Sequence, residues 1–228
     1  MWQPFSAFHH SFHFFTKTMN KVNVQVATPE HSKFAKEISD LIEISAHQRG
    51  TGIAKRSPEY ISNKIDQGSA IIALVGKELA GFCYIESWDN KSYVANSGLI
   101  VKHNFRSLGI AKKIKKKAFE HSKKLFPGAK LFGLTTSLPV MKINSDLGYI
   151  PVTYGELTRD EAFWKGCQSC VNYEILKSKD KTNCMCTAML HDPKEKETKR
   201  RNFMKKSKLY DRFMQMKKKR MTLKLFVL

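Results

Sequence analysis

The chain has 228 residues, 42% of them hydrophobic, and a formal net charge of +20. This size suits one globular domain with residues left over for tails, and no apolar run approaches the ~20 residues that a membrane-spanning helix needs. Residues 177–228 hold 17 Lys and Arg against 5 Asp and Glu, a net +12, so the other 176 residues carry +8. Five cysteines without an export signal predict reduced thiols and a cytoplasmic protein.

Residues 1–18 are rich in Phe and His, and they lack the basic start and small-residue cleavage site of a secretory signal. A strand of alternating valines follows directly after Met19. We interpret Met19 as the biological start and residues 1–18 as a non-core N-terminal extension. The alternative is an arm that packs on the domain or binds a metal through its histidines.

The first half of the chain alternates between apolar patterns of strand and of helix period. Pro29 and the pair Ser57-Pro58 are helix-start signals. We expect, in order, a strand over 20–27, helices over 30–47 and 58–66, and strands over 70–75, 79–87 and 92–102.

The second half continues with a helix over 110–126, a strand over 131–135, a helix over 139–147 and a strand that begins at Ile150. Pro127-Gly128 ends the first of these helices, and Gly148 caps the second. Strands with helices between them predict an α/β or α+β layer fold, and the hairpins between residues 70 and 102 argue against a purely parallel sheet.

The turn between strand 92–102 and helix 110–126 is the most informative stretch, Arg106-Ser107-Leu108-Gly109-Ile110-Ala111. The first N–H groups of a helix have no partner inside the helix, and the helix dipole is positive there. Gly109 lets the backbone approach an anion, and Arg106 adds a charge-assisted contact. The turn therefore predicts a phosphate-binding site.

The spacing R-x-x-G-x-A, between an apolar strand and a basic amphipathic helix, resembles motif A of the GNAT acyltransferases. The resemblance implies a mixed, mostly antiparallel central sheet with splayed middle strands and flanking helices. It also implies acetyl-CoA, or another acyl-CoA, as co-substrate, with its pyrophosphate at the turn and its pantetheine arm between the parted strands. The expected contacts are Leu99, Ile100, Val101, Arg106, Ser107, Leu108, Gly109, Ile110, Ala111 and Lys112.

Three further segments resemble the acetyltransferase domain of N-acetylglutamate synthase, an enzyme family of arginine synthesis. Residues 52–57 are similar to its G-I-L-V-R-R-S, residues 134–136 to its L-T-T, and residues 148–152 to its G-F-x-P-V. The match runs from about 22 to 152 without that family's amino-acid-kinase domain. The resemblance thus implies a short, stand-alone N-acyltransferase acting on a primary amine, with an amino acid such as glutamate as the best candidate.

Three positions depart from the pattern of these families. Ser137 stands where the synthase has an Arg after L-T-T, and Ala95 where it has an acidic residue in the motif strand. Asn144 stands where many GNAT enzymes carry a tyrosine, so no tyrosine general acid is assigned. A related acyl acceptor or a different acyl-CoA therefore stays open.

Lys55 and Arg56, on a Gly-containing loop, could clamp the carboxylates of a dicarboxylic amino acid, since Arg offers a bidentate fork and Lys a point charge. The alternative is that both are solvated charges before a helix. The resemblance adds Thr135, Thr136 and Ser137 to the expected acceptor site.

Acyl transfer requires a base that takes a proton from the attacking amine. Glu86, at the end of strand 79–87, is the candidate base, and His103, near the motif turn, is the second. The alternatives are a surface Glu at a strand end and an ordinary loop His. We expect the oxyanion of the transition state to be held by backbone donors near residues 99–101.

Cys167-x-x-Cys170 and Cys184-x-Cys186 could supply the four thiolates of a tetrahedral zinc site. The alternative is that these thiols pack between strands over 171–176 and 184–190. We assign residues 19–153 to the GNAT catalytic domain, 154–192 to a cysteine-containing extension of the sheet, and 193–228 to a basic helix and tail.

The basic tail leaves other functions open. A helix over 194–220 could dock on the domain, contact nucleic acid or meet an acidic membrane surface. A nucleic-acid-associated module is the alternative from another class, but the chain lacks a zinc-finger pattern, an RNP-type strand and a clear helix-turn-helix. Within GNAT, a protein amine or a polyamine is the alternative acceptor. A homo-oligomer is also open.

Overall fold

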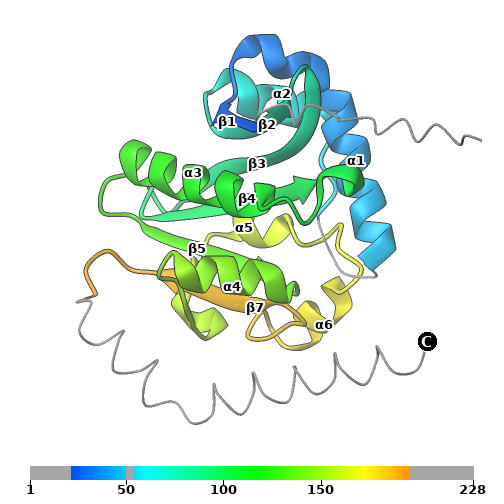
Figure 1. The fold of residues 1–228 in the computed structure, drawn as a ribbon. Helices are drawn as coiled ribbons and strands as arrows, with labels where there is room; N and C mark the ends of the chain where they lie inside the picture. Colours follow the sequence, from blue (N-terminus) through cyan, green and yellow to red (C-terminus); the bar gives the residue numbers. More distant parts are fainter. Residues whose placement is uncertain (1–21, 50–53, 196–228) are drawn as a thin grey trace, which may run out of the picture.

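The computed structural model describes residues 22–49 and 54–195 (Figure 1). The predicted extension 1–18 and, apart from residues 193–195, the basic tail lie outside the described residues. The strands are β1 Val22–Val26, β2 Ala70–Val75, β3 Glu78–Trp88, β4 Tyr93–Val101, β5 Lys130–Thr135, β6 Ile150–Pro151 and β7 Thr187–His191. The α-helices are α1 Ala35–Arg49, α2 Pro58–Asp66, α3 Ile110–Leu125, α4 Leu138–Asp146, α5 Glu161–Lys165 and α6 Tyr173–Ser178, and short 3₁₀ turns are η1 Pro29–Phe34, η2 His103–Phe105 and η3 Tyr154–Glu156.

The described strands form one seven-stranded sheet in the order β1-β2-β3-β4-β5-β7-β6. Every neighbouring pair is antiparallel except β4 and β5, which are parallel. The parallel pair follows from the crossover through α3, because parallel strands need a long connection and antiparallel strands only a tight turn. This sheet confirms the predicted α+β fold with a mixed, mostly antiparallel sheet.

Helices cover both faces of the sheet, and each face has its own core. On the face that we call the α1 face, α1 and α2 pack through Ile38, Ile42, Ile61 and Ile65, and α5 and α6 pack further along it. On the opposite face, called the α3 face, α3 packs through Ile110, Ile114 and Ala118, and α4 lies beside it. Figure 1 shows α3 and α4 together on the near side of the sheet.

The parallel pair β4–β5 is short, and the two strands part beyond it. Their register covers only Tyr93↔Lys130, Val94↔Leu131 and Ala95↔Phe132. The register of β4 against β3 shifts just after this, next to Gly98, which has a φ of +63°. A Cβ at Gly98 would lie 2.3 Å from the ring of Tyr84. The glycine therefore permits the irregular pairing of β4 with β3 at this point. We call the place where β4 and β5 separate the fork.

Two predicted elements differ from the structure. Helix 30–47 is divided into η1 and α1. The strand expected over 171–176 was wrong, because Tyr173–Ser178 is helix α6. The alternation of Val171, Tyr173 and Ile175 suggested a buried strand face, yet Val171 and Ile175 are exposed and Leu176 is the residue that α6 buries. None of the described helices is long and apolar enough to span a membrane.

Candidate functional site

The motif turn has the geometry that its sequence predicts. Gly109 is the N-terminal cap of α3 with a left-handed φ of +72°, and a Cβ there would meet nothing within 4 Å. Ser107 is also left-handed, with φ of +64°. The exposed Arg106 curls over the turn, its Nε donating to the Val101 carbonyl at 3.3 Å. The first amides of α3 therefore begin at an open surface, where an anion can approach them.

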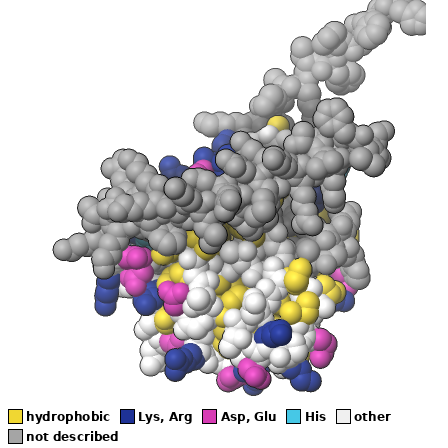
Figure 2. Space-filling model, turned by 90° about the horizontal axis from the view of Figure 1, so that it is seen from below, with side chains coloured by type: hydrophobic (Ala, Val, Ile, Leu, Met, Phe, Trp, Pro, Cys, Tyr) yellow, Lys and Arg dark blue, Asp and Glu magenta, His cyan; other side chains and the backbone are white. Residues whose placement is uncertain are grey.

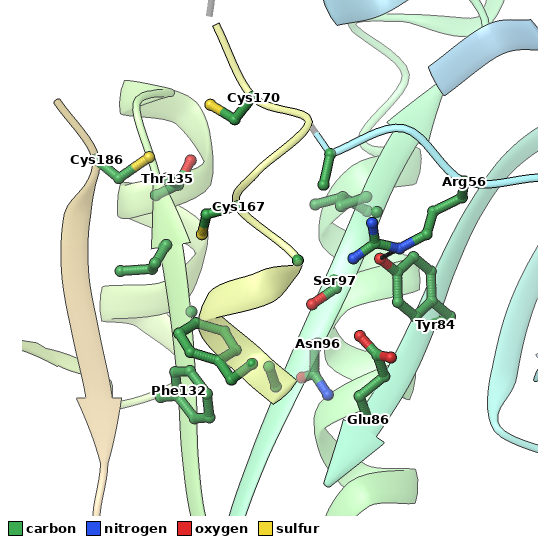
Figure 3. A pocket seen from close by; sticks show the side chains of 18 of the residues that line it. Arg56, Tyr84, Glu86, Asn96, Ser97, Phe132, Thr135, Cys167, Cys170 and Cys186 are labelled. Atoms are coloured by element: carbon green, nitrogen blue, oxygen red, sulfur yellow. Dashed lines mark hydrogen bonds between the residues drawn. The ribbon is translucent and has the colours of Figure 1, made fainter. Parts of the chain in front are cut away.

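A cavity of about 670 Å³ lies at the fork and is lined from both faces of the sheet. From the α1 face come Arg56, Tyr84 and Glu86, and from the α3 face come Lys115 and Asn144. Figure 3 shows Arg56, Tyr84 and Glu86 gathered on one side, with Thr135 and three cysteines on the other. The parted strands thus leave a passage through the sheet, since side chains of both faces reach the same space.

Arg56 is held by several contacts in the cavity wall on the α1 face. Its Nε donates to the Tyr84 hydroxyl at 2.9 Å, and one terminal nitrogen donates to the Lys55 carbonyl at 2.9 Å. The guanidinium also lies 5.1 Å from the centre of the Tyr60 ring, a cation–π contact. Burial opposes the charge, but the neighbouring Tyr84, Tyr60 and Glu86 outweigh it and raise the pKa of Arg56. The side chain is therefore a fixed cation inside the cavity.

Glu86 lies beside this cation at the same wall. Its side chain is 16% exposed, and it accepts a hydrogen bond from the Tyr60 hydroxyl. The Nζ of Lys64 lies 3.4 Å from the same carboxylate oxygen, Oε1. Burial, followed by the charges of Tyr84 and Glu86, raises the pKa of Tyr60 far above its ordinary value, so this phenol keeps its proton. The carboxylate is held in place and stays in contact with the cavity.

The other predicted acceptor residues also line the cavity, but Lys55 differs from the expected clamp. Its side chain is 60% exposed, and its Nζ lies 2.7 Å from Glu43. Thr135, Thr136 and Ser137 lie where β5 leads into α4. Arg56 thus faces the cavity, whereas Lys55 lies at the rim and is engaged by a surface carboxylate.

The predicted CoA contacts divide into two groups. Leu99 lines the cavity, and the turn 106–112 lies beyond it at the far end of β4. The side chains of Ile100 and Val101 belong to the hydrophobic cores on either face. His103, the second candidate base, is exposed in η2 and is not among the residues that line the cavity. Of the two candidate bases, Glu86 thus lines the cavity and His103 does not, and the identity of the base stays a prediction.

All four cysteines of the predicted zinc site, Cys167, Cys170, Cys184 and Cys186, line the same cavity. Burial, reinforced by the neighbouring thiols, raises the pKa of Cys186 to about 12 and that of Cys167 to about 11. Within residues 22–49 and 54–195, no group of three or more His, Cys, Asp or Glu side chains is arranged to hold a metal ion. The zinc site stays a prediction. One equivalent of zinc in the purified protein would support it, and a protein without zinc would contradict it.

The sequence analysis missed several residues of the cavity. Tyr60, Lys64 and Tyr84 surround Arg56 and Glu86, and Tyr84 could have been found because it lies two residues before Glu86 on the same strand face. Lys115 was treated only as one of the lysines of the basic helix over 110–126, but it is 2% exposed. The sequence feature that could have indicated this burial is the position of Lys115 in the buried stripe of α3, between Ile114 and Ala118.

Known proteins agree with this fold. Residues 40–141 match the acetyltransferase (GNAT) family. N-acetylglutamate synthase from Neisseria gonorrhoeae, complexed with coenzyme A and N-acetyl-glutamate, is similar at 16% identity and a TM-score of 0.56, over 77% of this chain and 36% of that chain. The chain thus spans little more than a third of that protein.

Two smaller proteins are similar over nearly their whole length. A Mycobacterium tuberculosis protein in complex with CoA and NLQ is 14% identical with a TM-score of 0.53, over 75% of this chain and 98% of that chain. A GNAT-family acetyltransferase from Streptococcus pneumoniae is 9% identical with a TM-score of 0.50, over 75% and 99%. At such identities the likeness is one of fold, and no curated protein matches the chain in sequence at a significant level. The family match over residues 40–141, the forked sheet and the open turn before α3 together show that the chain has the fold of the GNAT acetyltransferases.

Proposed function

We propose that this protein transfers an acetyl group from acetyl-CoA to the primary amine of a small amino acid that bears a further carboxylate, with glutamate as the first candidate. The observation that carries the proposal is the cavity at the fork, where a fixed cation, Arg56, and an oriented carboxylate, Glu86, lie side by side. The synthase from Neisseria gonorrhoeae, whose fold is similar, was solved with coenzyme A and N-acetyl-glutamate. A role in arginine biosynthesis follows if glutamate is the acceptor.

The donor would enter from the α3 face. Its diphosphate would meet the amides that begin α3 and the side chain of Arg106, because these are the open donors of the turn. The rest of the donor would run back along β4 from the turn to the fork, since α3 returns antiparallel to β4. The thioester would then lie near residues 96–99, which line the cavity.

The acceptor would enter from the α1 face, and the charges there favour an anionic one. On this face, three cationic side chains line the cavity, Lys55, Arg56 and Lys165, against one carboxylate, Glu86. Such a balance disfavours a polyamine, whose ammonium groups would meet like charges. Arg56 would hold a carboxylate of the acceptor, and Glu86 would face its amine.

The reaction would then need little beyond positioning and one proton transfer. The amine must lose a proton before its lone pair attacks the thioester carbonyl, and Glu86, directly or through a water molecule, would accept that proton. Tyr60 and Lys64 orient the carboxylate. The backbone of β4 near residues 99–101 would offer N–H groups to the developing oxyanion.

A panel of amines tests the proposal. Purified protein is incubated with acetyl-CoA or succinyl-CoA and each of glutamate, aspartate, ornithine, spermidine and a lysine-containing peptide, and release of the free thiol is followed. We expect acetyl-CoA with glutamate to give the highest kcat/KM. Faster turnover of spermidine or of the peptide would overturn the assignment of an anionic acceptor, and no turnover with any amine would overturn the proposed activity.

A further inference from the structure

Lys115 is a buried lysine whose amine faces the cavity at the fork. The side chain is 2% exposed, and its Nζ donates to the Asn96 carbonyl at 3.1 Å. Asn96 directly follows Ala95, the last residue of β4 that pairs with β5. The amine also lies 5.6 Å from the centre of the Tyr149 ring. The lysine therefore sits at the point where the two strands separate.

The position of Lys115 along α3 places it beside the end of the donor. It lies six residues after Gly109, which is about 9 Å along a helix axis. Along β4, Asn96 lies six residues before Lys102, about 20 Å back from the turn at the rise of a strand, and the long side chain of Lys115 reaches its carbonyl. A donor anchored at the turn thus brings its thioester toward Lys115 on the α3 face. Among the described residues, it is the only ionisable side chain that α3 or α4 contributes to the cavity.

Asn144, on α4, gives a second and independent sign that a ligand belongs here. It is 1% exposed and lines the cavity, and its Oδ1 is the one buried side-chain N or O atom of the described residues that has no hydrogen-bond partner. A buried acceptor without a partner destabilises the protein, and a donor group on a bound ligand would satisfy it. An amide side chain cannot act as an acid, so it cannot protonate a leaving group.

We propose that Lys115 is the catalytic acid of this enzyme, giving its proton to the sulfur of coenzyme A as the thioester breaks; this rests on the proposed acetyl transfer. The amine of the acceptor forms a bond to the carbonyl carbon, and its proton goes to Glu86 or to water. The C–S bond then breaks, and its electron pair stays on sulfur. The sulfur takes a proton from Nζ, and Lys115 regains one from water. The products are an amide and a free thiol.

The surroundings of Lys115 suit a group that must give up a proton. Burial lowers the pKa of Lys115, and the nearby Cys83 thiol opposes this in part. Burial also raises the pKa of Cys83 to about 11 and raises that of Tyr149, so both neighbours keep their own protons at neutral pH. Asn96, whose carbonyl accepts the hydrogen bond from Lys115, is not ionisable, and neither is Ser122, which accepts a hydrogen bond from the Asn96 side chain. No other acid competes with Lys115 on this side of the cavity among the described residues.

The test compares Lys115→Met and Lys115→Arg with the wild type. Methionine keeps the length of the side chain without charge, and arginine keeps the charge but does not release its proton. Lys116→Met, at an exposed lysine one position along α3, is the matched control. We expect both Lys115 variants to lower kcat about 100-fold while the Kd of acetyl-CoA changes less than about 3-fold. Lys116→Met should behave as the wild type.

A second measurement needs no acceptor. Coenzyme A bound to each protein is titrated with pH, and the ultraviolet absorbance of its thiolate is followed. We expect the thiolate to form at a lower pH on the wild type and on Lys115→Arg than on Lys115→Met, because a nearby cation stabilises it. Equal titration of all three proteins, or a kcat of Lys115→Met within about 3-fold of the wild type, would overturn the proposal. A loss of acetyl-CoA binding as large as the loss of kcat would also overturn it, because Lys115 would then only maintain the structure of the binding site.

The two measurements separate this proposal from the proposed function. Suppose that the wild type acetylates none of the amines but binds coenzyme A, and that the titration of the bound thiol depends on Lys115. This result would overturn the proposed acetyl transfer, but it would support the position of Lys115 beside the sulfur. An active wild type with an unaffected Lys115→Met would remove the lysine alone. Failure to bind coenzyme A would remove both.

Discussion

The two sides of the fork are built by different means. On the α3 face, the proposed donor site consists of backbone amides at one turn, and its key residue, Gly109, has no side chain at all. On the α1 face, the proposed acceptor site consists of side chains from the loop before α2, from α2 itself and from β3. A site made of backbone amides needs only the right local conformation. A site made of side chains also needs the fold to bring segments that are distant in the sequence within contact of one another.

This difference leads to different expectations for mutation. A change in the turn should affect one binding step and leave the rest of the cavity intact. A change in the cavity wall should affect several neighbours together, because Arg56, Tyr60, Tyr84 and Glu86 contact one another. Four substitutions test this comparison.

Gly109→Asp should have the largest effect, because it places a carboxylate where the diphosphate would bind. We expect the Kd of acetyl-CoA to rise about 100-fold or more, since opposing like charges at a binding site costs several kcal/mol. Isothermal calorimetry gives the Kd. Gly128→Asp is the control, because Gly128 is also left-handed and open but lies beyond the other end of α3. An unchanged Kd for Gly109→Asp would contradict the donor site.

Glu86→Gln should come next. It keeps the shape of the side chain but removes the base, so we expect kcat to fall about 100-fold with the Kd of acetyl-CoA unchanged. Steady-state kinetics with the preferred amine measure the effect. Glu120→Gln, at an exposed pair with Lys116 on α3, is the control. A kcat close to that of the wild type would transfer the role of base to another group.

Arg56→Ala should act on the acceptor alone. Losing a charge-assisted contact costs about 1.5–3 kcal/mol, so we expect the KM for a dicarboxylic acceptor to rise about 10-fold or more while acetyl-CoA binding is spared. Lys55→Ala is the matched neighbour and should have a much smaller effect, because Lys55 is engaged by Glu43 at the surface. A similar loss with every amine, including those without a carboxylate, would argue against the clamp.

Gly98→Ala should have the smallest effect on binding and act on stability. The left-handed backbone and the clash with Tyr84 predict a loss of about 1–3 kcal/mol in the free energy of unfolding. Gly68→Ala separates the two causes, because Gly68 is equally left-handed but its Cβ would meet nothing within 4 Å. Urea denaturation compares the variants. If both variants lost the same free energy of unfolding, the clash with Tyr84 would contribute nothing to the effect of Gly98→Ala.

Charge on the described surface bears on the nucleic-acid alternative. The face seen in Figure 2 carries Lys and Arg side by side with Asp and Glu wherever the described residues are visible, with hydrophobic side chains between them. This mixture is typical of an ordinary solvated surface and gives no basic patch on that part of the face. The basic tail over 196–228, on which that alternative mainly rests, lies outside the described residues.

Local signals in the sequence were enough for much of the fold. Helix α2 begins at Pro58 as expected, because Ser57 accepts a hydrogen bond from the Tyr60 amide and caps it. The alternation of apolar residues placed β2, β3 and β4 within one or two residues of their observed bounds. The exception was 171–176, where alternation over a few residues did not reveal that a single leucine would be buried.

The sequence by itself determined most of the elements and the open turn before α3, because a cap, a glycine and an apolar period act on neighbouring residues. The tertiary structure decided which charges face the cavity. It buried Lys115 under the fork, brought Tyr60 against Glu86, and left Lys55 at the rim. The physical reason is that burial and pairing depend on which strands part and which helices cover them, and these are long-range contacts that no short segment contains.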